Sequence, residues 1–115
     1  MSRYPIEQIQ SWHAHVYFDA GSQERAAALY EVVREQFPQT ELGRFHEKPV
    51  GPHPIGSYQI HFAPENLMEI VSWFALNRDG LDVLVHPNTG DALGDHRDRA
   101  VWVGKSYELD LSMLG

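Results

Sequence analysis

The sequence predicts an α+β fold of the ferredoxin-like, split βαβ type, in which a four-stranded antiparallel sheet carries two helices on one face. Two observations support this prediction. Segments with strand-like alternation and segments with helical periodicity follow one another in the order strand, helix, strand, strand, helix, strand. The chain has 115 residues, which suits one hydrophobic core. We therefore assign residues 1–115 to a single domain.

The first predicted strand covers residues 12–18 and alternates between two kinds of side chain. Successive side chains of a strand point to opposite faces of its sheet, so each kind gathers on one face. The apolar set comprises Trp12, Ala14, Val16 and Phe18, and the other set comprises His13, His15 and Tyr17. We expect the helices to cover the apolar set, which leaves two imidazoles on the uncovered face.

The middle of the chain predicts one helix and two strands. A helix is expected over residues 23–36, because apolar residues recur there at steps of three and four, and Pro38 follows it. Strands are expected at 42–47 and 57–62, where apolar and polar residues alternate. The segment 48–56 between them contains three prolines and is predicted to be a stiff loop.

The last part of the chain supplies a second helix and a fourth strand. Pro64 suits the first turn of a helix that is expected to run over residues 65–77. An apolar run at 81–86 predicts a buried strand. The polar segment 91–99 is expected to be a loop or a short helical piece, and 100–104 a short strand.

Composition narrows the range of partners and chemistries. The formal charge of -7 disfavours nucleic acid and anionic membranes. The absence of cysteine excludes disulfides and thiolate catalysis, so that a metal site would use histidine, carboxylates and water. No apolar run approaches the roughly 18 to 20 residues of a membrane span, and the polar start of the chain does not resemble a signal peptide. We therefore expect a cytoplasmic protein.

Most of the seven histidines are expected to meet at one edge of the uncovered face. We place the first strand centrally, parallel to the third strand and antiparallel to the fourth. The expected cluster then comprises His13, His15, His46, His53 and His86. On the same reasoning His61 lies at the far end of the third strand. We interpret His96 as an ordinary surface residue and Asp95 as a solvated loop acid or a turn-former.

Three stretches of the chain also carry a family resemblance. They read WHAHVY at 12–17, GRFHEKPVGPHP at 43–54 and LNRDGLDVLVHPNTG at 76–90. On these motifs the chain, from about residue 12 to residue 112, resembles the DOPA 4,5-dioxygenase family of catechol ring-cleaving enzymes and their bacterial relatives. The resemblance implies a single domain of that type. It also implies extradiol cleavage of DOPA or a related catechol by non-haem Fe(II) and O2.

The shared face and edge suggest a role for each member of the cluster. We assign His13, His15 and His86 as metal ligands for Fe(II), although a purified sample could hold zinc. Many non-haem iron oxygenases use two histidines and one carboxylate, but no carboxylate joins this cluster in the predicted sheet, so a histidine-rich site is expected.

The remaining polar residues of the same face are assigned to the substrate. Either His46 or His53 is expected to act as the general base and acid near the catechol. Arg44 is expected to meet a substrate carboxylate, and Tyr17 to contribute to substrate binding.

Two other functions remain open at this stage. The chain could be a non-catalytic, dimeric ligand-binding module whose histidines line a pocket or an interface, which predicts no oxygen uptake with any catechol. It could also be a zinc-dependent enzyme acting on small molecules by a redox-silent reaction. A homodimer is expected in any case from the size of the chain and the uncovered face of the sheet.

Overall fold

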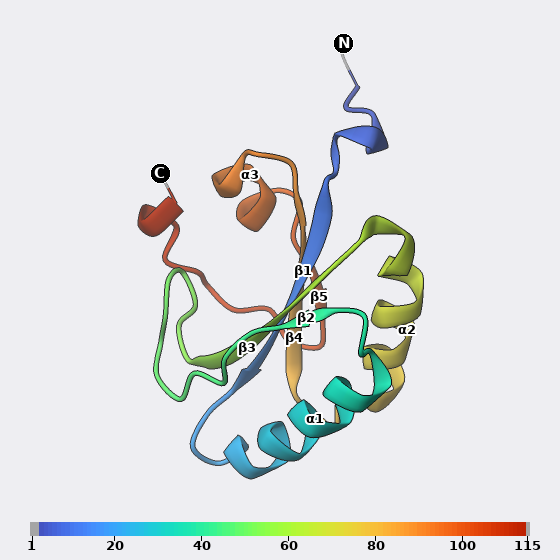
Figure 1. Cartoon of the computed structure of the whole chain (residues 1–115). Helices are drawn as coiled ribbons and strands as arrows, with labels where there is room; N and C mark the ends of the chain where they lie inside the picture. Colours follow the sequence, from blue (N-terminus) through green and yellow to red (C-terminus); the bar gives the residue numbers. More distant parts are fainter. Residues whose placement is uncertain (1–2, 115) are drawn as a thin grey trace.

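The computed structural model describes residues 3–114 and contains a five-stranded antiparallel sheet in the order β2-β3-β1-β4-β5 (Figure 1). The strands are β1 Ser11–Phe18, β2 Glu41–Leu42, β3 Gly56–Phe62, β4 Asp82–Asn88 and β5 Val101–Val103. The helices are α1 Gln23–Gln36, α2 Leu67–Asn77 and α3 Ala92–Arg97, with 3-10 turns at Ile6–Gln8, Pro64–Asn66 and Leu111–Leu114. No helix among these is long and apolar enough to cross a membrane.

The predicted α+β class is confirmed, but the sheet has five strands where the sequence predicted four. The fifth strand is β5, which lies within the short strand expected at 100–104 and pairs with β4 so that Val103 lies opposite Val83 and Val101 opposite Val85. A three-residue strand is too short for its periodicity to show which neighbour it joins. Its place in the sheet therefore depends on the tertiary structure.

Helices α1 and α2 cover one face of the sheet, which we call the helix face (Figure 1). The observed bounds of α1 are those that the periodicity predicts, and its buried residues Ala26, Leu29 and Val33 recur at three- and four-residue steps. They share one core with Ile70 and Phe74 of α2 and with the apolar side chains of the strands. The strand residues of this core are Ala14, Val16, Phe18, Tyr58, Ile60, Phe62, Val83 and Val85.

The second strand is shorter than the sequence predicts. Of the expected span 42–47, only Leu42 pairs regularly with β3, as part of the two-residue strand Glu41–Leu42, and His46 forms an isolated bridge with Ser57. Between them Phe45 packs against the core, where its ring stacks on Phe18 with centroids 4.4 Å apart. A single alternating pattern does not anticipate this interruption of the pairing.

The direction of β3 corrects a second expectation. β1 and β3 are antiparallel, not parallel as the sequence analysis assumed. The helix α1 connects β1 to β2 so that these strands run the same way, and β3 lies between them, antiparallel to both. As a result His61 lies directly opposite His13, and Ser57 opposite Tyr17.

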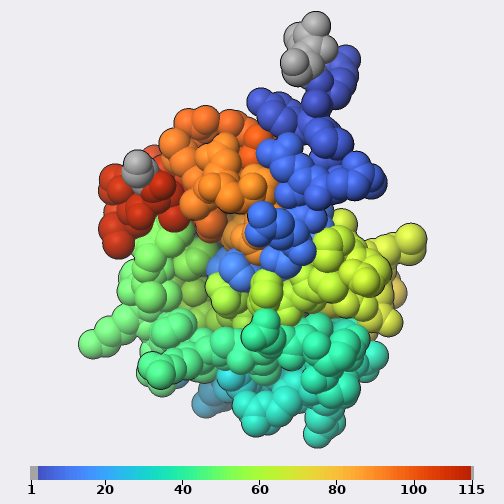
Figure 2. Space-filling model, turned by 45° about the horizontal axis from the view of Figure 1, so that its top comes forward, coloured from blue at the N-terminus to red at the C-terminus, as the bar shows by residue number. Residues whose placement is uncertain are grey.

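The other face of the sheet, which we call the histidine face, is covered by irregular segments. Figure 2 shows the loop 43–56 in green, α3 in orange and the C-terminal segment in red lying next to one another. The backbone N–H of Asp110 donates to the carbonyl oxygen of Pro52 at 2.9 Å, which ties the C-terminal segment to this loop. These segments close over the sheet and define the site described next.

Candidate metal centre

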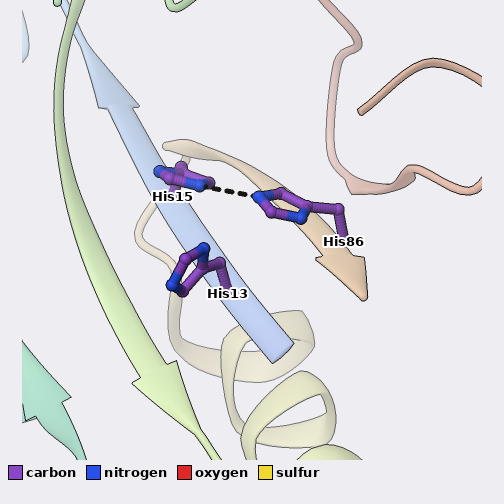
Figure 3. A group of neighbouring side chains, drawn as sticks. All are labelled: His13, His15 and His86. Atoms are coloured by element: carbon purple, nitrogen blue, oxygen red, sulfur yellow. Dashed lines mark hydrogen bonds between the residues drawn. The ribbon is translucent and has the colours of Figure 1, made fainter. Parts of the chain in front are cut away.

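Three imidazoles converge on the histidine face (Figure 3). His13 and His15 share that face of β1, and His86 reaches them from β4, where it lies opposite His13 in the antiparallel register. One ring nitrogen from each residue lies within 4.8 Å of the others. His15 and His86 are buried, whereas His13 is half-buried. The structure thus brings together the three residues that the sequence analysis assigned as metal ligands.

The hydrogen bonds of His86 leave the lone pair of its Nε2 available where the three imidazoles converge. Its Nδ1–H donates to the carbonyl oxygen of Pro87 at 3.0 Å, so in the neutral ring Nε2 carries no proton. His86 Nε2 faces His15 Nε2 at 3.0 Å, and only one proton fits between the two nitrogens. A cation bound by both nitrogens would replace that proton.

Burial keeps these imidazoles neutral. The pKa of His86 is lowered to about 3 and the pKa of His13 to about 4, mainly by desolvation and in part by the neighbouring imidazoles. Desolvation also lowers the pKa of His15 well below its usual range, with further lowering by His53. At neutral pH the cluster therefore presents nitrogen lone pairs rather than positive charge, as metal binding requires.

This donor set fits a transition metal. Two nitrogens that each lie about 2.1 Å from one ion, at an angle near 90°, are about 3 Å apart, as the Nε2 atoms of His15 and His86 are. Neutral imidazole suits iron, zinc and copper. The nearby carboxylate of Asp95 is engaged by Thr89 and Arg99 and is absent from the converging group, so the ligands found among residues 3–114 are all imidazoles.

His53 stands beside this group and is held by Tyr17. The loop 43–56 brings the His53 ring to 4.2 Å from the ring of His15, measured between centroids. Tyr17 and His53 share a hydrogen bond of 2.6 Å between the phenolic oxygen and Nδ1. Burial raises the pKa of the Tyr17 phenol, so the hydroxyl stays protonated, and desolvation lowers the pKa of His53 to about 4.

A cleft of about 270 Å³ opens next to His15 and His53. Arg44 and His46 line it, and Arg44 is exposed while His46 is half-buried. His46 lies at the end of β1 that carries Tyr17, through its bridge to Ser57, and not beside His13 as expected. Tyr17 is 1% exposed, and its hydroxyl is hydrogen-bonded to His53. It therefore contacts His53 from the protein interior and does not line the cleft.

Two histidines that were not predicted to join the cluster, His61 and His96, lie directly beside it. His61 lies next to His13, with ring centroids 5.0 Å apart, because β3 runs antiparallel to β1. Its Nδ1–H donates to Glu41 at 2.6 Å, and Ser11 Oγ lies 2.8 Å from its Nε2. His96 of α3 packs on His86 with centroids 3.9 Å apart.

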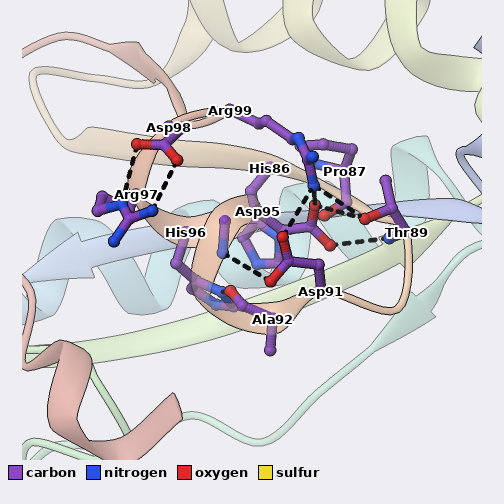
Figure 4. Close-up of polar contacts among 11 residues, drawn as sticks. His86, Pro87, Thr89, Asp91, Ala92, Asp95, His96, Arg97, Asp98 and Arg99 are labelled. Carbon is purple, nitrogen blue, oxygen red and sulfur yellow. Dashed lines mark hydrogen bonds and ion pairs between the residues drawn. The ribbon is translucent and has the colours of Figure 1, made fainter. Parts of the chain in front are cut away.

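Asp95 was expected to be a solvated loop acid or a turn-former, and it is not solvated. It is 2% exposed and accepts three hydrogen bonds (Figure 4). The position of Asp95 and His96 relative to the sheet depends on how α3 folds back. Hydrophobic periodicity carries no information on that path.

These observations define a class of protein: a small α+β domain in which imidazoles from two strands converge next to a cleft. The model of the Dopa 4,5-dioxygenase family matches residues 12–113. The chain therefore belongs to the Dopa 4,5-dioxygenase family.

Individual relatives agree with this assignment. The chain is 36% identical to a protein named DOPA 4,5-dioxygenase from Amanita muscaria, over 93% of this chain and 50% of that protein. It is also 36% identical to an "Uncharacterized 21.2 kDa protein" from Botryotinia fuckeliana, over 90% of this chain and 63% of that protein. The chain thus spans only about half to two thirds of the length of these curated relatives.

A solved structure resembles the whole domain. The crystal structure of a protein from Nostoc punctiforme PCC 73102, named "putative dioxygenase", superposes with a TM-score of 0.89. The two chains are 44% identical, and the match covers 97% of this chain and 96% of the other.

Proposed function

We propose that this protein is an extradiol ring-cleaving dioxygenase that acts on DOPA or a related catechol with non-haem Fe(II) and O2. The observation that carries the proposal is the convergence of three neutral imidazoles beside a cleft that is lined by two more, those of His46 and His53. Family membership and the name of the Amanita muscaria relative support it. The choice of substrate, of the extradiol ring position and of iron belongs to the proposal.

His13, His15 and His86 would hold the metal, and the bound metal would supply a Lewis acid for the diol and a centre for O2 chemistry. Each of the three presents one ring nitrogen to the same point. The Pro87 carbonyl fixes His86 in the tautomer that leaves Nε2 free to bind a metal. Burial of His15 and His86 limits competition from water at that point.

His53 is the acid–base residue in this proposal. It lies against His15 and lines the cleft, where an imidazole can take a proton from a catechol hydroxyl. The phenol of Tyr17 can donate to Nδ1 or accept from it, so the bond at 2.6 Å survives a change of His53 tautomer. Tyr17 thereby orients His53 and, being buried, does not need to touch the substrate.

Arg44 and His46 would contact the part of the substrate that lies away from the metal. Arg44 is exposed at the cleft, so its guanidinium can reach a carboxylate on a bound catechol. His46 lies on the same wall and offers a second polar contact. A homodimer and a cytoplasmic location remain predictions from the sequence.

Oxygen consumption by anaerobically iron-loaded protein tests the proposal. The protein would be given a panel of catechols that includes DOPA, and ring-opened product would be followed by its visible absorbance. We expect oxygen uptake and a yellow product that require both iron and an intact vicinal diol. Catechols that carry a carboxylate should have the lower KM, and Arg44→Ala should remove that preference.

Two results would contradict the proposal. No uptake from protein that demonstrably holds ferrous ion would favour a non-catalytic ligand-binding module. Activity without oxygen uptake, supported by zinc and not by iron, would favour a zinc-dependent enzyme.

A further inference from the structure

His96 lies closer to His86 than the other rings of the cluster do. The centroids of His96 and His86 are 3.9 Å apart, with an angle of 38° between the ring planes. The corresponding distances from His86 to His15 and His13 are 5.1 Å and 5.2 Å. His96 belongs to α3 and not to the sheet, so strand register does not place it there. Its position depends on what holds α3.

A buried carboxylate fixes α3 to the turn that follows β4 (Figure 4). Asp95 accepts hydrogen bonds from Thr89 N and Thr89 Oγ1, both at 2.8 Å, and forms an ion pair with Arg99 Nη1 at 2.9 Å. We call these three residues the Asp95 clamp. A helix of six residues is too short to be stable alone, so α3 depends on contacts with the rest of the chain, and the clamp supplies polar ones.

The start of α3 and the His96 ring are restrained as well. The backbone N–H of Gly94 donates to Asp91 Oδ1 at 3.1 Å, and a Cβ atom at Gly94 would collide with the Asp91 carboxylate. Glycine at this position therefore allows the close approach. His96 Nδ1–H donates to the carbonyl oxygen of Ala92 at 2.8 Å, which fixes the ring relative to its helix.

His86 is consequently held from two sides. Its Nδ1 is bound to the Pro87 carbonyl, and the ring of His96 packs against its own ring. Together these contacts oppose rotation of the His86 side chain. They keep its Nε2 directed at the Nε2 of His15, 3.0 Å away.

We propose that His96 is a positioning residue of the metal centre, and that the Asp95 clamp holds it against His86. This inference rests on the metal centre of the proposed function. His96 acts through packing and not as a ligand, because its nitrogens are outside the converging group of ligand atoms. The role is comparable to that of outer residues that orient metal-binding histidines elsewhere.

The test measures metal binding in the absence of catechol and oxygen. Co(II) would be titrated anaerobically into the wild type and into His96→Ala, His96→Phe and Asp95→Asn. Arg97→Ala is the matched control, since Arg97 is the exposed neighbour of His96 on α3 and forms its ion pair with Asp98. The readouts are the dissociation constant, the visible spectrum of bound Co(II) and the melting temperature.

We expect His96→Ala to weaken Co(II) binding by about 10- to 100-fold and to change the Co(II) spectrum. Phenylalanine restores a flat ring without a nitrogen, so His96→Phe should recover most of the affinity. Asp95→Asn should weaken binding because the clamp loses its ion pair. Arg97→Ala should bind Co(II) as the wild type does.

Two results would overturn the positioning role. One is wild-type affinity and spectrum in His96→Ala. The other is His96→Phe binding no better than His96→Ala, which would show that a nitrogen is required. Failure of the wild type to bind Co(II) would overturn the metal centre as well. Normal Co(II) binding without oxygen uptake by the iron form would count against the proposed reaction alone.

Discussion

The two faces of the sheet are built from the same strands but by different rules. On the helix face, Ala14, Val16 and Phe18 of β1 meet α1 and α2 in one apolar core. On the histidine face, His13, His15 and Tyr17 of the same strand meet polar groups from loops and from α3. Any well-packed apolar side chain satisfies the first face, whereas the second needs particular atoms at particular distances. Substitutions on the two faces should therefore fail in different ways.

The sharpest contrast is between His86 and Val85, neighbours on β4 that point to opposite faces and are both buried. His86→Ala should abolish metal binding and turnover, because one of three converging nitrogens is lost. Val85→Ala should cost about 2 kcal/mol of unfolding free energy and leave metal binding per folded molecule unchanged. Metal content and urea unfolding of both variants would be compared. Full iron occupancy in folded His86→Ala would remove His86 from the ligand set.

A second variant separates chemistry from metal binding within the histidine face. His53→Ala should keep the metal and lower kcat by about 10²- to 10⁴-fold, because the imidazole beside the cleft supplies acid–base catalysis. The measurement is steady-state oxygen uptake with metal content determined on the same sample. His46→Ala is the comparison, since His46 lines the same cleft farther from the ligands. Loss of metal in His53→Ala would place His53 among the ligands instead.

Acid should lower the unfolding free energy of the protein through the buried imidazoles of the histidine face. Burial lowers the pKa of His86 from 6.5 to about 3 and the pKa of His53 to about 4, so the unfolded chain binds more protons than the folded chain between these values and 6.5. Stability is then fully present above pH 6.5 and falls as the pH is lowered toward 4.

This loss should amount to several kcal/mol in the metal-free protein and should be smaller in His53→Ala. Thermal melting across this pH range measures it. A melting temperature that stays constant from pH 7 to pH 4 would contradict the neutral, buried state of these imidazoles.

The smallest expected effect is that of Tyr17→Phe. The substitution removes the hydrogen bond to His53 and leaves the ring, so kcat should fall by about 10-fold with KM and metal content unchanged. Tyr107→Phe is the control, because Tyr107 packs on Tyr17 but its hydroxyl binds Asp82 instead. A higher KM with unchanged kcat would support the original assignment of Tyr17 to substrate binding.

Much of the fold and part of the site could be predicted because they depend on local pattern. The α1 bounds follow from periodicity, and the facing of His13, His15 and His86 follows from alternation along two strands. The prediction for His61 was wrong because it needed the direction of β3, which one strand's pattern does not contain. The nearness of His96 was missed because it depends on a six-residue helix held by a buried carboxylate.

Local sequence pattern is enough to predict which residues of a strand or helix face the core and which histidines lie on the opposite face of the sheet. Alternation and helical periodicity are properties of neighbouring residues, and they persist whatever the rest of the chain does. Three features became known from the three-dimensional structure alone. They are the antiparallel direction of β3, the path of the loop that brings His53 over His15, and the packing of His96 on His86. Those contacts join residues far apart in the chain, and their geometry depends on all the segments that fold between them.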